Sequence, residues 1–219
     1  MNILTIEDPI EYTLEGVNQV QLKEAIGLTF SSALRTFLRQ DPDIIMLGEI
    51  RDPDTAQMAT RAALTGHLVL STIHTNSAIG TITRLSDMNV PGYLIANTLN
   101  LSVAQRLVRV LCPDCKKEQK FDASYLPHNY RNAKIPNTHH IAVGCDNCFF
   151  TGYKGRKAVY EVIPISEEIS DHIRKGTLST EIVKEKISVK FLHKSAFELF
   201  CQGKTSIEEI YPILLTGTY

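Results

Sequence analysis

Short apolar runs alternate with longer amphipathic stretches along the first half of the chain. Residues 44–47 are four apolar residues with an Asp-Pro pair on each side, which is too short for a helix and indicates a buried strand. Residues 67–73 and 3–6 form two similar runs, and residues 55–65 between two of them have helical spacing. The pattern predicts an α/β fold with a right-handed βαβ unit.

The same reasoning predicts the remaining elements. Before the first cysteine we expect helices over residues 31–40, 77–86, 94–99 and 104–108, and a short hairpin around residues 14–18. Alternating residues 158–163 predict a strand that returns to the core. From Ser166 onward the pattern is helical, with Ser166 as one N-cap and a capping box beginning at Thr205 and Ser206 as another.

Three chemically active side chains follow the predicted strands. Glu7, Glu49 and His74 stand at or just beyond their carboxyl ends, where parallel sheets carry their chemistry. Each also has an ordinary structural explanation: a solvated acidic turn for Glu7, a favourable helix N-terminal charge for Glu49, and a structural histidine for His74. Arg35, Arg39 and Arg51 surround the Glu49 strand, and their roles stay open.

Four cysteines form two Cys-x-x-Cys pairs. They are Cys112, Cys115, Cys145 and Cys148, and 29 residues separate the pairs. This spacing suits tetrahedral Zn²⁺ in a closed, structural site. Disulfides are the main rival, but a reducing compartment is expected because the sequence shows no signal peptide. His139 and His140 are expected to be exposed loop residues, and Cys201 a buried free thiol.

Composition narrows the choice of function. The 219 residues carry 23 basic and 24 acidic side chains, a net charge of −1, with no dense Lys/Arg tract. Nucleic-acid binding gains nothing from this balance and is not expected. The 43% hydrophobic content is ample for a substantial core.

Three segments together resemble the ATPases that power type II secretion and type IV pilus assembly. They are TIEDPIEY at residues 5–12, like the family's acidic box; LRQDPDIIMLGEIRD at 38–52, like its Walker B segment; and AALTGHLVLSTIHTN at 62–76, like its histidine box. The resemblance implies a P-loop-type (RecA-like) core that hydrolyses ATP with Mg²⁺ as part of a hexameric ring. It also implies a location in the cytoplasm against the bacterial inner membrane, with secretion or pilus platform proteins as partners.

The resemblance also assigns roles to residues. Glu49 would polarise the attacking water, and Glu7 would act on the side of the nucleotide where the metal ion binds. His74 would contact the γ-phosphate, and His67 would belong to the same nucleotide-binding box. A four-cysteine insert favours secretion or pilus extension over retraction within this family.

No Gly-x-x-x-x-Gly-Lys-Ser/Thr run occurs in the chain, so the phosphate-binding loop has no candidate. We therefore expect a C-terminal part of a longer ATPase that is inactive alone. The expected segments are a partial core at residues 1–111, a metal-binding insert at 112–148, a return strand at 149–165 and a helical region at 166–219. The alternative is a zinc-ribbon module that binds nucleic acid or protein, for which Lys116, Lys117 and Lys120 would supply charge.

Overall fold

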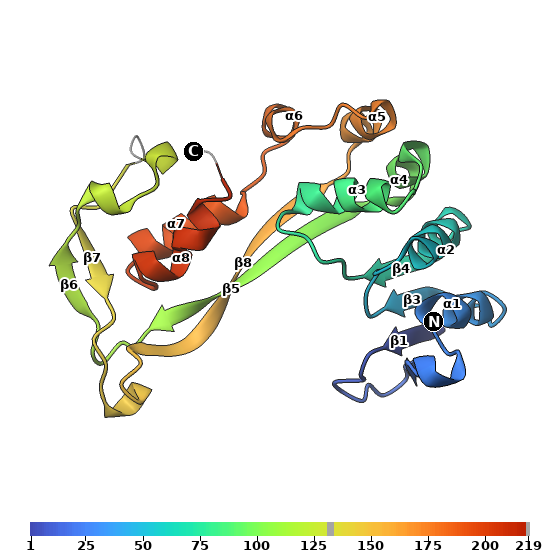
Figure 1. Cartoon of the computed structure of the whole chain (residues 1–219), viewed down its shortest axis with the longest axis horizontal. Coiled ribbons are helices and arrows are strands. Elements are labelled where there is room, and N and C mark those ends of the chain that lie inside the picture. Colours follow the sequence, from blue (N-terminus) through green and yellow to red (C-terminus); the bar gives the residue numbers. More distant parts are fainter. Residues whose placement is uncertain (131–133, 218–219) are drawn as a thin grey trace. The chain divides into compact units, whose positions relative to one another are not determined.

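The computed structural model describes residues 1–130 and 134–217 of the chain (Figure 1). Two compact units are present. Unit 1 comprises residues 1–102 and 163–187, and unit 2 comprises residues 103–162 and 188–219. The four segments expected from the sequence were defined by motifs and not by compactness. The two units therefore do not test those segments, which stay a prediction.

Unit 1 contains a parallel sheet of four strands. In spatial order they are β2 (Asn18–Gln21), β1 (Ile3–Glu7), β3 (Ile44–Leu47) and β4 (Leu68–Ser71). The register pairs Ile6 with Leu47 and Leu47 with Ser71, so the strands end at one edge of the sheet. The predicted α/β class and the strand at residues 44–47 are confirmed. The predicted hairpin is wrong, because β2 pairs parallel to β1 rather than antiparallel.

Helices α1 (Phe30–Phe37) and α2 (Pro53–Leu64) pack on one face of this sheet. Their apolar stripes meet the strand residues that point the same way, since side chains alternate between the faces of a strand. The shared core contains Leu4, Ile6, Phe30, Leu34, Phe37, Ile45 and Leu47. On edge strand β4, Leu68 and Leu70 remain 49% and 48% exposed.

The start of each of these two helices is fixed by a side chain. The Thr29 hydroxyl accepts a hydrogen bond from the backbone N–H of Ser32, and the Asp52 carboxylate accepts one from Thr55. Pro53 stands in the first turn of α2, where its missing N–H costs nothing. Helix α2 therefore begins directly behind β3, which fixes the loop that carries residues 48–52.

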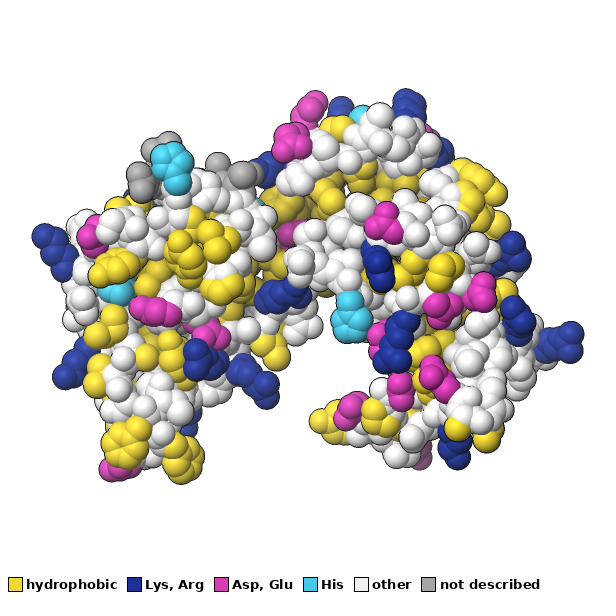
Figure 2. Space-filling model, viewed as in Figure 1, with side chains coloured by type: hydrophobic (Ala, Val, Ile, Leu, Met, Phe, Trp, Pro, Cys, Tyr) yellow, Lys and Arg dark blue, Asp and Glu magenta, His cyan; other side chains and the backbone are white. Residues whose placement is uncertain are grey.

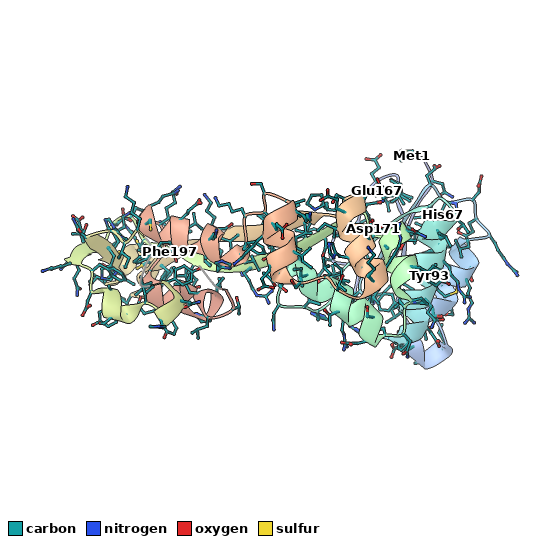
Figure 3. All side chains as sticks on the ribbon, turned by 90° about the horizontal axis from the view of Figure 1, so that it is seen from above. Met1, His67, Tyr93, Glu167, Asp171 and Phe197 are labelled. Atoms are coloured by element: carbon teal, nitrogen blue, oxygen red, sulfur yellow. The ribbon has the colours of Figure 1, made fainter. Side chains whose placement is uncertain are left out.

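The rest of unit 1 is helical. It contains the short 3₁₀ turn η1 (Glu24–Ile26) and helices α3 (Ala78–Asp87), α4 (Gly92–Thr98), α5 (Glu167–Lys175) and α6 (Thr180–Lys186). Figure 3 labels Glu167 and Asp171 on α5. The Ser166 hydroxyl accepts from the backbone N–H of Ile169, which confirms the N-cap predicted from the sequence.

Strands β5 (Leu101–Leu111) and β8 (Tyr153–Pro164) form a two-stranded sheet. The helix predicted over residues 104–108 is wrong, because these residues belong to β5. Burial alternates along much of β5: Ser102, Ala104 and Val108 are buried, whereas Leu101, Val103, Gln105 and Leu107 are exposed. That period of two is typical of a strand with one covered face.

Unit 2 adds an excursion and two helices. The excursion comprises β6 (Lys117–Lys120), η2 (Ala123–Tyr125), η3 (His128–Tyr130), β7 (Thr138–Ile141) and η4 (Asp146–Cys148), with β6 and β7 antiparallel. The helices are α7 (Leu192–Cys201), which carries Phe197 (Figure 3), and α8 (Ile207–Leu214).

Both helices of unit 2 begin without a side-chain cap of their own. The buried carboxylate of Glu161, on β8, accepts a hydrogen bond from the backbone N–H of Leu192 at 3.3 Å and so satisfies the start of α7. The capping box predicted at Thr205 and Ser206 is wrong: the Thr205 hydroxyl bonds the carbonyl of Arg109, and that of Ser206 bonds the phenol of Tyr153.

Among residues 1–130 and 134–217, no helix combines the length and the apolar character needed to cross a bilayer.

Candidate functional site

An open depression of about 400 Å³ lies where β1, β3 and β4 end in unit 1. Its lining comes from the two acidic segments after β1 and β3 and from the end of β4; among the lining residues are Glu7, Asp8, Glu11, Phe30, Gly48, Glu49 and Thr72. Figure 2 shows acidic, basic and histidine side chains gathered over this region. The parallel register therefore brings together the strand-end residues that the sequence singled out.

Glu49 is largely enclosed, with 15% of its side chain exposed. Its Oε1 accepts a hydrogen bond from Arg51 at 2.5 Å, and its Oε2 lies 3.0 Å from Nε2 of His74. Arg51 also reaches Asp8, with 3.4 Å between the charged atoms. Glu49 and His74 therefore meet, and Arg51 joins the segments after β1 and β3.

The electrostatics of this cluster favour an ionised Glu49. The hydrogen bond from Arg51 is the largest cause that lowers the pKa of Glu49 below 4.5; burial opposes it, and the charges of Arg51 and His74 add to the lowering. The same hydrogen bond raises the pKa of Arg51. Glu49 is thus a carboxylate at neutral pH, as an acceptor of protons or of water hydrogens must be.

Glu7 lies beside this cluster at the end of β1. Its Oε1 accepts from the Thr5 hydroxyl at 2.6 Å and from the Gln19 amide at 2.9 Å. Gly48, the residue before Glu49, donates its N–H to the carbonyl oxygen of Ile6, the residue before Glu7, at 2.8 Å. A Cβ on Gly48 would stand 3.3 Å from that carbonyl oxygen, so the close approach of the two strand ends favours glycine.

His67 is not part of this cluster. It precedes β4, at the end of that strand opposite Ser71, and its Nδ1 lies 3.0 Å from the carbonyl oxygen of Ala62 and 3.2 Å from the Thr65 hydroxyl. These contacts hold the loop between α2 and β4.

The three arginines whose roles could not be assigned from the sequence lie in two places. Arg51 is in the Glu49 cluster, and its spacing of two residues from Glu49 was the signal that could have placed it there. Arg35 and Arg39 are exposed and line a separate depression of about 530 Å³ beside α1, which Ser32, Thr36, Leu38 and Met58 complete.

The four cysteines converge in unit 2. All four sulfur atoms lie within 4.8 Å of one another; Cys112 and Cys145 are 3.9 Å apart, and Cys148 is 3.8 Å from both Cys115 and Cys145. A tetrahedral ion with Zn–S bonds of about 2.3 Å separates its sulfurs by about 3.8 Å. Within the described residues, this is the one set of three or more His, Cys, Asp or Glu ligand atoms close enough to share an ion.

Backbone groups hold the sulfurs in place. The N–H of Gly144 points to the sulfur of Cys115 at 3.3 Å, and those of Cys145 and Gly152 point to the sulfur of Cys148 at 3.2 Å. A Cβ on Gly144 would lie 2.7 Å from the carbonyl oxygen of Phe150, and one on Gly152 would lie 2.6 Å from the Cβ of Ala142. Both glycines have positive φ, so these turns need glycine for two reasons.

Without a cation the thiols do not ionise equally. Burial tends to raise the pKa of Cys148, but the backbone N–H groups of Cys145 and Gly152, with hydrogen bonds from neighbouring cysteines, lower it to about 6. Burial and the hydrogen bonds of Cys148 and Cys115 raise the pKa of Cys145 to about 12. The cluster thus starts with one favoured thiolate, and a divalent cation would stabilise the others as thiolates.

Two predictions about nearby residues are wrong. His139 is buried on β7, where its ring contacts Phe121 and Phe200 at centroid distances of 4.9 and 5.9 Å. Side chains alternate between the two faces of a strand, and His139 lies on the buried face of β7. The prediction of a loop did not include this alternation. Cys201 is exposed rather than buried because α7 ends there.

Comparison with known proteins gives consistent matches over most of the chain. The model of a family described as "Type II/IV secretion system protein" matches residues 1–212. The chain is 45% identical over 214 residues to the type IV pilus assembly ATPase PilB of Myxococcus xanthus, which covers 95% of this chain and 38% of that relative. It is 43% identical over 210 residues to the type II secretion system protein E of Pseudomonas aeruginosa, covering 95% and 42%.

Solved structures share the fold. The crystal structure of the pilus retraction motor PilT with bound ADP aligns with a TM-score of 0.68 and 29% identity, over 95% of this chain and 51% of that one. The Legionella pneumophila ATPase DotB aligns with a TM-score of 0.68 over 99% and 52%, at 24% identity. The chain spans about two fifths of the length of the curated relatives it matches.

Proposed function

Because the chain belongs to the type II/IV secretion system protein family, as its motifs indicated, we propose that it supplies the catalytic half-site of an ATPase that powers type II secretion or type IV pilus assembly. Unit 1 is then part of a P-loop-type core. The phosphate-binding loop comes from elsewhere in the working protein, since this sequence has none. The 219-residue chain alone is accordingly expected to hydrolyse ATP poorly.

The arrangement of Glu49 carries this proposal. Phosphoryl transfer to water needs a group that orients the attacking water and charges that neutralise the phosphate oxygens, with little covalent chemistry. Glu49, ionised and placed at the end of β3, would polarise the attacking water. His74, whose Nε2 lies 3.0 Å from Oε2 of Glu49, would contact the γ-phosphate. Glu7 would serve the bound Mg²⁺, and His67 would act indirectly, through the loop before β4 that its contacts hold.

The test requires an enzyme that supplies the missing part. In the M. xanthus ATPase, the 214 matched residues can be replaced by this chain, and the chimera is expected to hydrolyse ATP. Glu49→Gln keeps the side-chain size but removes the basic oxygen, so turnover should fall by about 10²- to 10⁴-fold. Glu15→Gln, in the exposed turn before β2, is the matched control and should leave turnover unchanged.

An active chimera whose Glu49→Gln variant turns over at the parent rate would overturn the role of Glu49. His74→Ala in the same chimera separates the two groups, because loss of a phosphate contact should lower turnover without abolishing nucleotide binding. Equal turnover of the His74→Ala variant would remove His74 from the mechanism.

The four cysteines are proposed to hold structural Zn²⁺. Three of the sulfur–sulfur separations, those of Cys112–Cys145, Cys115–Cys148 and Cys145–Cys148, match a tetrahedral ion. Three backbone N–H groups support the thiolates. Elemental analysis of the purified chain should find one zinc per chain, and Cys145→Ser should lose it. Exposed Cys201→Ser is the matched control and should retain the metal. A parent chain without metal would contradict the assignment.

The working protein is further proposed to be a homo-oligomeric ring, hexameric as in the family, that binds ATP with Mg²⁺. Its partners would be platform proteins of the inner membrane, met from the cytoplasmic side. The name of the M. xanthus relative, a type IV pilus assembly ATPase, supports the use of ATP, and the ring, the ion and the platform partners are proposed from the resemblance to the family.

A further inference from the structure

One amide side chain links Glu7 to the loop that follows it. Nε2 of Gln19, on β2, donates to Oε1 of Glu7 at 2.9 Å and to the backbone carbonyl oxygen of Tyr12 at 3.0 Å. Its Oε1 accepts a hydrogen bond from the backbone N–H of Leu14 at 2.7 Å. A single side chain thus contacts both the carboxylate at the end of β1 and the backbone of the loop between β1 and β2.

This loop has little packing of its own to hold it. Residues 8–16 include no buried side chain. The parallel register places Gln19 opposite Thr5, on the face of the sheet that also carries Glu7 two residues later. The position of Gln19 on β2 is therefore fixed by the sheet, and its hydrogen bonds transmit that position to the loop and to the carboxylate.

The two oxygens of Glu7 have different surroundings. Oε1 accepts from the Thr5 hydroxyl at 2.6 Å as well as from Gln19, and both donors are uncharged. Oε2 accepts no hydrogen bond from the described part of the chain. Within the residues that the structure describes, Glu7 forms no ion pair, whereas Glu49 pairs with Arg51. Glu7 thus has one oxygen and its charge available to a cation in the depression that it lines.

We propose that Gln19 is a positioning residue, which fixes the carboxylate of Glu7 so that Oε2 stays available to the Mg²⁺ of a bound nucleotide. The inference rests on the proposed function. Mg²⁺ binds one or two carboxylates together with phosphate oxygens and waters, so a free carboxylate oxygen fits it. Hydrogen bonds from neighbouring groups orient such a carboxylate and tune its affinity for the metal.

Holding the loop is the simpler role for Gln19. Its contacts with the backbone of Tyr12 and Leu14 would suffice for that role. The bond from Nε2 to Oε1 of Glu7 acts on the carboxylate itself, and Thr5 donates to the same oxygen. Two donors that converge on one oxygen restrict the rotation of the carboxylate, which favours the positioning role.

The first measurement uses the full chain without nucleotide. Three-bond NMR couplings report the side-chain rotamers of Glu7, and hydrogen exchange reports the protection of the Leu14 N–H. The parent should hold Glu7 in one rotamer. Gln19→Leu keeps a similar size and removes all three contacts, so Glu7 should then average over several rotamers and the Leu14 N–H should exchange faster.

Two further variants make this measurement specific. Gln21→Leu is the matched control, because Gln21 is exposed on the same strand and its side chain forms no hydrogen bond with the described residues. It should leave Glu7 and Leu14 as they are in the parent. Thr5→Val removes the other donor to Oε1 at nearly constant volume. It should release the rotamer of Glu7 and leave the Leu14 N–H protected.

The second measurement uses the chimera with the M. xanthus ATPase. In Gln19→Leu the Mg²⁺ concentration for half-maximal turnover should rise at least about tenfold, while turnover at saturating Mg²⁺ stays near that of the parent. A double-mutant cycle with Glu7→Gln shows whether Gln19 acts through Glu7. Once Glu7 has lost its charge, Gln19→Leu should cause no further change in the Mg²⁺ dependence.

Several outcomes would overturn the proposal. They are several rotamers of Glu7 in the parent, a single rotamer in Gln19→Leu, an equal effect of Gln21→Leu, or an active chimera in which Gln19→Leu leaves the Mg²⁺ dependence unchanged. An inactive parent chimera would instead contradict the proposed ATPase function. The rotamers of Glu7 in the chain would then still decide whether Gln19 positions it.

Discussion

Arg51 shows how one side chain can set the properties of a whole site. It donates to Glu49 at 2.5 Å, reaches Asp8 at 3.4 Å, and lies 6.0 Å from the ring centre of Phe30. The cation thus neutralises two of the acidic residues that line the depression at the ends of β1 and β3. A lysine could supply the charge but not the planar fork that reaches two carboxylates in different directions.

Replacing this arginine should change the ionisation of its neighbour. In Arg51→Gln the pKa of Glu49 should rise towards 4.5, because the largest cause of its lowering is removed. Carboxyl chemical shifts followed by NMR as a function of pH measure this directly. Arg61→Gln, exposed on α2, is the control and should leave the Glu49 titration unchanged; an equal shift in both variants would contradict a specific contact.

The same contact contributes to stability in a defined pH range. The pKa of Glu49 in the folded chain is lower than its ordinary value of 4.5, so the folded chain binds this proton less readily than the unfolded chain. The stabilisation is therefore present above about pH 4.5 and is lost as the pH falls through the lower value of the folded state. Because Arg51 is about half exposed, the effect is small.

At the scale of elements, the turns around the cysteines depend on glycine to different degrees. Gly152 has φ of 75° and Gly155 has φ of 81°, so alanine is strained at both. A Cβ on Gly152 would meet that of Ala142 at 2.6 Å, whereas one on Gly155 has nothing within 4 Å. Comparing substitutions at the two positions therefore separates the effect of backbone strain from the effect of a steric clash.

Alanine substitutions at these glycines should give unequal losses. Gly155→Ala should lower the free energy of unfolding by about 1–2 kcal/mol through backbone strain alone. Gly152→Ala should lower it further and weaken zinc binding, since it also displaces the N–H that supports the sulfur of Cys148. Urea unfolding of the zinc-loaded chains, with zinc release to a chromogenic chelator, measures both; equal losses would show that the collision is relieved without cost.

The elements best predicted from sequence were those with a local cause. Residues 44–47 have Asp-Pro boundaries, and α2 has Asp52 and Pro53 at its start, so strand and helix were both predictable. Residues 104–108 were not, because their strand state comes from pairing with β8, which begins only at Tyr153. The prediction of a capping box at Thr205 and Ser206 was wrong for a similar reason, because both hydroxyls form hydrogen bonds with residues far away in the sequence.

The residues of the candidate site show the same difference between local causes and tertiary partners. The residues that strand ends or short cysteine spacing bring together, Glu49 and His74 or Cys145 and Cys148, could be named from the sequence. The partner supplied by β2 could not. Gln19 reaches Glu7 only because β2 lies parallel to β1, the arrangement that the predicted hairpin missed.

For the whole molecule, the division into two units predicts a local response to loss of metal. The four cysteines all belong to unit 2, whereas the sheet that carries Glu7 and Glu49 belongs to unit 1. Chelation with EDTA should raise amide hydrogen exchange in β6, β7 and the turns at residues 144–152, and leave β1 and β3 protected. Exchange followed by mass spectrometry tests this; a uniform rise would mean that the metal holds both units.

The exposed side chains of β4 have a practical consequence for anyone handling this chain. Within the described residues β4 pairs with β3 alone, so its other edge offers unpaired N–H and C=O groups beside half-exposed Leu68 and Leu70. Such an edge is a template on which a further strand can add, from the same chain or another. Concentrated preparations will therefore tend to self-associate through it, and dilute samples with a charged substitution at Leu70 are the better material for solution work.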